Sequence, residues 1–250
     1  MRFGALIFPR ALMWRFGKMK GLLGQKVGMT EVYDEDGNRV PVTVLEGGPC
    51  PVLAVKTKAS DGYDAVVLGF RDKSEKRSVK PELGFFKKAN TAPKRFVREL
   101  RIDAGETVQV GQLCDIDSFT PGDYVDVTSV SIGKGFQGGI KRWHWKGGRA
   151  TRGSMHHRAP GSIGASSSPS RVFKGHHLPG HMGNVNRTVQ GLEVVSPDKE
   201  NHLLLVKGAV PGKKGFVVIQ LSRKKKHKVK IVQEKKEEKK EEKKKAPKKS

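Results

Sequence analysis

Between Val127 and Leu192 the chain carries ten Lys/Arg residues and not one Asp or Glu. Cationic side chains at this density can bind phosphate groups, and an arginine can do so through two parallel hydrogen bonds. Aromatic rings in the same stretch, among them Trp143 and Trp145, offer flat faces on which unpaired bases can stack. A carboxylate here would repel phosphate, so its absence is informative. The segment therefore predicts RNA binding with an affinity that falls steeply as salt rises.

The candidate RNA-binding side chains are of three kinds: cations for phosphates, rings for bases, and hydroxyls for ribose and phosphate. They are Lys134, Lys141, Arg142, Trp143, Trp145, Lys146, Arg149, Arg152, His156, His157, Arg158, Ser166, Ser167, Arg171, Lys174, His176, His177 and Arg187.

Two other interpretations of the segment stay open. A solvated, disordered basic loop would have the same charge, but it would not need apolar side chains such as Phe136, Ile140 and Phe173. These side chains favour a loop that folds on its RNA. The tryptophans could instead belong to a protein core.

Metal and enzyme chemistry are not predicted. His177 and His181 are four residues apart, but Pro179 between them breaks the helix that a zinc pair would need. Gly133-Lys134-Gly135 lacks the spacing of a phosphate-binding P-loop. Carboxylates for acid–base catalysis are missing where the glycines cluster. We therefore expect no catalytic residues, metal, cofactor or small-molecule substrate.

The whole chain, 250 residues with Lys+Arg 49 and Asp+Glu 25, has a formal net charge of +24. The excess lies in the acid-free stretch and in the two ends, residues 1–20 and 223–250, and leaves the remainder close to neutral. Such clustering indicates a polyanionic partner. No apolar run is long enough to cross a bilayer, so we expect no membrane partner. Cys50 and Cys114 lack metal-site spacing and suit a reducing compartment.

Short alternating apolar runs joined by turn residues predict a mainly β protein. The expected strands are 39–46, 51–57, 64–70, 96–102, 107–113, 124–132, 191–195, 202–208 and 215–222. This pattern favours a closed or nearly closed β-barrel.

Two further segments interrupt the strands. A charged stretch with a short helix after Pro81, stopped by Pro93, predicts a small inserted α+β subdomain at about 72–115. Residues 144–190 have almost no apolar periodicity, and a long extended loop is predicted at about 133–188, here called the finger. Its one expected helix is Gly135–Trp145.

The two ends of the chain differ from the body, 19–222. Residues 1–18 could be a dispensable or mis-started extension before Met19, an ordered RNA-contacting arm, or a targeting segment. The Lys/Glu-rich tail, 223–250, is predicted to be disordered on its own.

Over about residues 19–222 the sequence resembles a known family, the bacterial-type large-subunit ribosomal protein three. MKGLLGQKVGMT (19–30) is similar to the family's opening. Phe119, Asp126, Ser129, Ser131, Gly133-Lys134-Gly135, Gly138 and Arg142 fall at the spacing of its signature. KRWHW, HHRAPGSIG, VFKGHHLPGHMGN and LLLVKGAVPG are similar to further family blocks.

The resemblance implies a translation-protein-type β-barrel with an inserted α+β subdomain and a finger directed toward the peptidyl transferase centre. It implies primary binding near the 3′ end of 23S-type rRNA, nucleation of large-subunit assembly, and large-subunit ribosomal proteins fourteen and nineteen as neighbours. Many bacterial members carry a side-chain-methylated glutamine after PGSIG. Here that position is Ser167, which puts any such methylation in doubt.

The resulting hypothesis is a structural, non-enzymatic constituent of the large ribosomal subunit in the cytoplasm. An organellar ribosome is the alternative location, because of the basic N-terminal extension. A general RNA chaperone or nucleoid-type binder acting through its basic tails is the alternative function. Retention of specificity in high salt would distinguish the two functions.

Overall fold

The computed structural model describes residues 21–34, 36–102 and 108–224. They fall into two compact units. The first contains residues up to Ser129 together with those from Arg187 onward, and the second is Val130–Asn186. The predictions for residues 1–18 and 225–250 lie outside the described residues.

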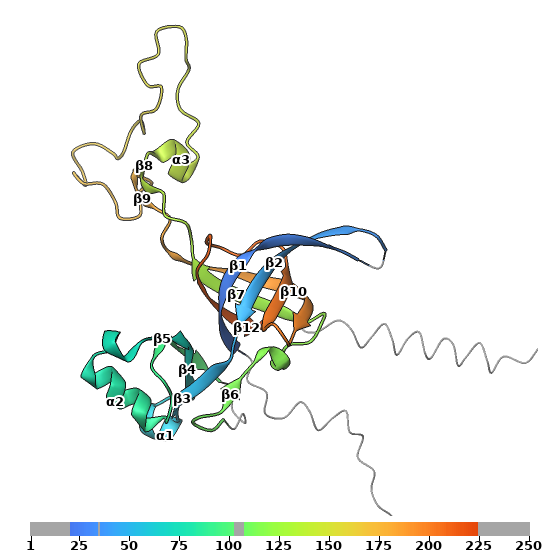
Figure 1. Cartoon of the computed structure of the whole chain (residues 1–250). Coiled ribbons are helices and arrows are strands. Elements are labelled where there is room, and N and C mark those ends of the chain that lie inside the picture. Colours follow the sequence, from blue (N-terminus) through green and yellow to red (C-terminus); the bar gives the residue numbers. More distant parts are fainter. Residues whose placement is uncertain (1–20, 35, 103–107, 225–250) are drawn as a thin grey trace, which may run out of the picture. The chain divides into compact units, whose positions relative to one another are not determined.

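The first unit is built on a closed β-barrel, which confirms the predicted mainly β fold (Figure 1). The barrel order is β1-β12-β7-β10-β11-β2. The strands are β1 (Gly21–Tyr33), β2 (Arg39–Gly47), β7 (Tyr124–Val130), β10 (Asn186–Asp198), β11 (Leu203–Lys207) and β12 (Phe216–Leu221). Alternating apolar side chains on these strands, such as Val125 and Val127 on β7, are fully buried. Alternation in the sequence thus becomes the two faces of a barrel wall.

A second, four-stranded sheet has the order β5-β4-β3-β6. Its strands are β3 (Cys50–Lys56), β4 (Ala65–Asp72), β5 (Lys94–Arg101) and β6 (Leu113–Cys114), and α1 (Lys58–Asp61), η2 (Glu75–Arg77), α2 (Lys80–Lys88) and η3 (Ile116–Ser118) lie between or after them. The helix expected after Pro81 is confirmed as α2, with the proline in its first turn, where a missing N–H is harmless. The range 72–115 holds α2, β5 and β6, whereas β3 and β4 of the same sheet precede it.

One continuous apolar core joins the barrel to this sheet, because Leu22, Val127 and Ile219 of the barrel cluster with Val66 and Leu68 of β4. The first unit therefore has a single main core. A smaller cluster of Leu53, Phe86 and Ala89 packs α2 onto the sheet.

Two strand predictions need correction. Over its described residues, 108–113, the expected strand 107–113 is wrong, because the chain turns at Gly111, which has φ +86°. Only Leu113–Cys114 pairs as a strand there. In contrast, β1 was not predicted as a strand, since Gly21, Gly24 and Gly28 lower its strand propensity. Gly24 is required for packing, because a Cβ would meet the backbone carbonyl of Glu46 on β2.

The second unit begins with a short two-stranded sheet of β8 (Gly135–Gln137) and β9 (Gly180–Met182), with α3 (Gly139–Trp143) directly after β8. The predicted helix Gly135–Trp145 is therefore wrong at both ends. Gly135 has φ +66° and its strand pairs with residues far along the chain, while His144 ends α3 in the left-handed region. Residues 144–179 contain neither helix nor strand, whereas the rest of the predicted finger, about 133–188, includes β8, α3, β9 and the start of β10.

Candidate nucleic-acid interface

The candidate residues are on the surface of the protein. Sixteen of the eighteen side chains are exposed, and only Arg142 and Trp145 are half-buried. All but Arg187 belong to the second unit. Because this unit contains no Asp or Glu, none of its cations can be neutralised within it. The unit thus presents its Lys and Arg side chains to a partner rather than to itself.

Backbone hydrogen bonds hold the two sides of the second unit together at its start. Ser131 N–H donates to Val185 O at 2.9 Å, and Lys134 N–H donates to Met182 O at 2.8 Å. Gly183, at φ +77°, lies so close to Ile132 that a Cβ would meet the carbonyl of Ile132. This pairing positions Lys134 at the beginning of the exposed cationic surface.

A second connection is formed by side chains of α3. Trp143 stacks on His177, with ring centroids 4.0 Å apart and planes 7° from parallel. Trp143 Nε1–H donates to Leu178 O at 2.9 Å, and a guanidinium N–H of Arg142 donates to the same oxygen at 2.8 Å. The guanidinium carbon of Arg142 lies 5.0 Å from the Trp143 ring centroid. Three predicted RNA-binding residues are therefore brought together, and each already has a protein contact.

The other tryptophan packs as well. Trp145 lies against Gly139 so closely that a Cβ on Gly139 would meet its ring. Gly139 is the buried residue of α3. The flat face that we expected Trp145 to offer to bases is thus partly used in packing.

Residues 144–176, the part of the finger between α3 and His177, make further local contacts. Gly148 N–H donates to His157 O at 3.2 Å, which places the His156–His157 pair beside the glycines. Arg171 lies 5.7 Å from the ring centroid of Phe173, a side chain that is 60% exposed. Ser166, Ser167, Lys174 and His176 are exposed in the same loop.

In the first unit, in contrast, several lysines form ion pairs with carboxylates. Lys56 contacts Glu99 at 2.8 Å, Lys73 contacts Glu82 at 2.6 Å, and Lys94 contacts Asp72 at 2.6 Å. The hydrogen bond from Lys73 lowers the pKa of Glu82.

Glu99 behaves in the same way. The hydrogen bond from Lys56 is the main cause of its lowered pKa. These pairs neutralise cations that would otherwise attract phosphate. Carboxylates thus offset part of the cationic charge of the first unit, whereas the second unit has no carboxylate to offset its own.

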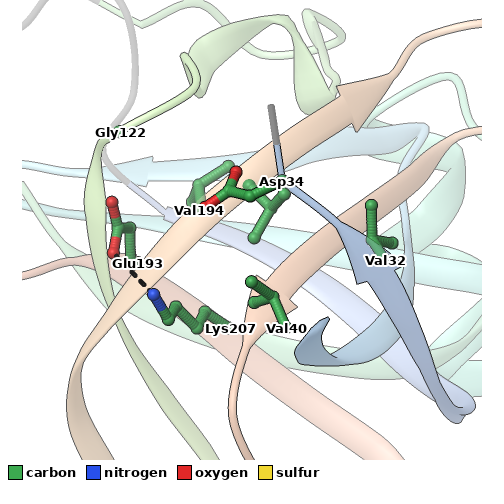
Figure 2. A pocket seen from close by; sticks show the side chains of 8 residues that line it. Val32, Asp34, Val40, Gly122, Glu193, Val194 and Lys207 are labelled. Atoms are coloured by element: carbon green, nitrogen blue, oxygen red, sulfur yellow. Dashed lines mark ion pairs between the residues drawn. The ribbon is translucent and has the colours of Figure 1, made fainter. Parts of the chain in front are cut away.

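Other features of the described residues offer weaker candidates. A hollow at the barrel is lined by four valines, Gly122, two carboxylates and Lys207, which forms an ion pair with Glu193 at 3.9 Å (Figure 2). Within the described ranges, no three His, Cys, Asp or Glu side chains gather as a metal would require. No helix among these residues has the length and apolar character needed to span a membrane.

Sequence reasoning missed the role of Leu178, whose backbone oxygen accepts both hydrogen bonds from α3. A backbone acceptor leaves no signal in residue type. It also missed the close approach at Gly180, where a Cβ would lie 2.5 Å from an Arg142 nitrogen. A glycine directly after Pro179 was the only available hint.

Comparisons with known proteins identify the family to which the chain belongs. The family model described as Ribosomal protein L3 matches residues 101–202, which include the whole second unit. The chain is 50% identical over 200 residues to "Large ribosomal subunit protein uL3" of Geobacter sulfurreducens, covering 80% of this chain and 95% of that protein. The chain belongs to the ribosomal protein L3 family.

Two further members of the L3 family match the chain with similar identity and coverage. The protein of this name from Alkaliphilus metalliredigens is 53% identical over 207 residues, covering 82% of this chain and 99% of its own length. That from Geobacillus stearothermophilus is 51% identical over 212 residues, covering 84% and 99%. The resemblance found in the sequence blocks is thereby confirmed.

Proposed function

We propose that this chain is a structural rRNA-binding protein of the large ribosomal subunit and that it binds RNA mainly through its finger. Membership of the L3 family makes it a ribosomal protein of the large subunit, as its relatives are named. The observation that carries the RNA-binding part is the acid-free, exposed second unit with its Lys and Arg side chains.

The binding chemistry follows from the exposed groups. Each Lys or Arg that meets a phosphate releases condensed counterions, which favours binding at low salt. Arg149, Arg152 and Arg158 are exposed and have no acid within their unit. Ser166 and Ser167 can hydrogen-bond to ribose or phosphate oxygens. Phosphate and shape contacts of this kind position a protein on folded RNA without reading a long base sequence.

Finer details are proposed from the family resemblance. They are primary binding near the 3′ end of 23S-type rRNA, nucleation of large-subunit assembly, and approach of the finger to the peptidyl transferase centre. Large-subunit ribosomal proteins fourteen and nineteen are the proposed neighbours. Ser167 in place of the methylated glutamine implies that the finger works here without that modification.

The same comparisons support a role without catalysis, because the relatives are named as ribosomal proteins and not as enzymes. Their bacterial sources support a cytoplasmic ribosome as the location. The organellar alternative gains no support from them.

Deletion of the loop tests the proposal. In a strain whose only copy lacks residues 146–175, we expect the first unit to fold, because the barrel core contains none of the deleted residues. We expect its large subunits to be immature, because the deleted residues include Lys and Arg side chains proposed to bind rRNA. A matched variant that replaces the same segment by a Gly/Ser linker of equal length separates loss of chain length from loss of side chains. Normal large subunits in both strains would refute the proposed role of the finger.

A further inference from the structure

Trp143, His177 and Arg142 were expected to contact RNA directly, but the structure engages all three within the protein. His177 covers one face of the Trp143 indole at a centroid distance of 4.0 Å. Trp143 Nε1–H, which would otherwise be free to meet a base or ribose, donates to Leu178 O at 2.9 Å. Trp143 is 38% exposed, so the stack lies at the surface rather than in a core.

The contacts join two parts of the chain that are distant in sequence. Trp143 ends α3, and His177 with Leu178 lies just before β9. The residues between them, 144–176, form the part of the loop without helix or strand. A contact between the two ends of such a loop restricts the conformations of everything between them.

The backbone near this contact leaves room for the side chains of Arg142 and Trp143. Gly180 lies where a Cβ would come within 2.5 Å of an Arg142 nitrogen. His144 follows α3 at φ 60° and ψ 40°, and its N–H donates to Ile140 O at 3.0 Å. The helix thus ends directly after Trp143, and the chain turns away from the stack.

We propose that Trp143, His177 and the Leu178 carbonyl form a clasp that closes the base of the RNA-binding loop before RNA is present. Trp143 and His177 are then positioning residues, and they act on RNA through the loop that they hold. The inference rests on the proposed function, because the loop's ligand is taken to be rRNA. A loop that is already closed loses less conformational entropy on binding, so the clasp raises affinity without contacting phosphate.

The clasp is tested first in the free, full-length protein. With indole nitrogens labelled, the Trp143 Nε1–H signal, assigned by its loss in Trp143→Phe, should exchange with solvent much more slowly than an unbonded indole. His177→Ala should speed that exchange, and His177→Phe, which keeps a stacking ring, should restore it. Exchange of Trp143 at the rate of a free indole would overturn the clasp, whatever the protein does with RNA.

Binding to a large-subunit rRNA transcript then separates positioning from direct contact. Loss of the stacked pair in His177→Ala should weaken binding between about 2- and 10-fold, the range for one aromatic pair. The slope of affinity against salt should not change, since no phosphate contact is lost.

His177→Phe should recover the affinity, and His181→Ala, an exposed histidine of β9, should leave it unchanged. A reduced salt slope in His177→Ala, or no recovery with phenylalanine, would show that His177 contacts RNA directly and would overturn the proposal. If the unmodified protein has no affinity for the transcript, the proposed function fails, while the exchange measurement still decides the clasp.

Discussion

Removing two finger cations should change the salt dependence of RNA binding by a calculable amount. Arg149 and Arg158 are exposed, and their unit contains no carboxylate, so replacing both by glutamine breaks no ion pair inside that unit. Each neutralised phosphate contributes between about −0.7 and −0.9 to the slope of log affinity against log salt concentration. If both arginines meet phosphates, the slope should become shallower by about 1.4 to 1.8.

The same numbers give the loss of affinity. At about 0.1 M salt, a change of this size weakens binding by about 25- to 60-fold, or about 2 kcal/mol. The assay is titration of a large-subunit rRNA transcript with full-length protein at several salt concentrations. Circular dichroism and urea unfolding of both proteins check that the fold is unchanged.

A matched control removes the same charge elsewhere. Lys76 and Arg77 are adjacent, exposed residues of η2 in the first unit. Replacing both by glutamine should leave the slope within experimental error of the unmodified protein. Equal slope changes for the two double variants would refute the reasoning, because the RNA-binding charge would then be spread over the surface.

Three other outcomes follow from the first and second units. Burial raises the pKa of Cys50 to about 12 and of Cys114 to about 11. Iodoacetamide at pH 8.5 should therefore leave both thiols unmodified until urea unfolds the chain, and labelling of the folded protein should begin only as the pH approaches 11, at Cys114 first. Rapid labelling of the folded protein at pH 8.5 would contradict this. Lys26→Met should lower the free energy of unfolding by about 1 to 3 kcal/mol, because Val210 O and Gly212 O lose the ammonium that donates to them at 2.7 and 3.1 Å. Equal or higher stability in urea would mean that relief of the buried charge dominates. Gly183→Ala should speed hydrogen exchange of the Lys134 amide, because a Cβ cannot fit beside Ile132 O at φ +77°; unchanged exchange would refute the close approach.

The barrel was predictable because its strands alternate. Val40, Val42 and Val44 predicted a strand at 39–46, and the structure has β2 at Arg39–Gly47. Strand β1 was not predictable from propensity, because its glycines lower that propensity, and the close approach of backbones that requires Gly24 is visible only in the folded barrel.

Long-range pairing also decided the errors in the second unit. Gly135–Gln137 fits a helix locally but pairs with Gly180–Met182, a partner that no local pattern identifies.

The candidate site was predictable in its charge but not in its internal contacts. The absence of acids between Val127 and Leu192 is visible in the sequence, and the structure leaves most of those cations exposed. The ring on which Trp143 stacks lies far along the chain, so residue type could suggest a ring for stacking but not that His177 would be the ring it meets. Whether each exposed residue touches RNA stays a prediction.

The central claim is that the finger lies against rRNA in the large subunit, and a tethered cleavage reagent measures this directly. Because both native thiols are buried, a cysteine introduced at Ser167 can be labelled selectively with an iron chelate that cuts nearby RNA. In large subunits assembled with this protein, we predict strong cuts in the large-subunit rRNA from position 167 and weaker cuts from a Lys76→Cys control. Fully occupied subunits without cuts above background from position 167 would contradict the account.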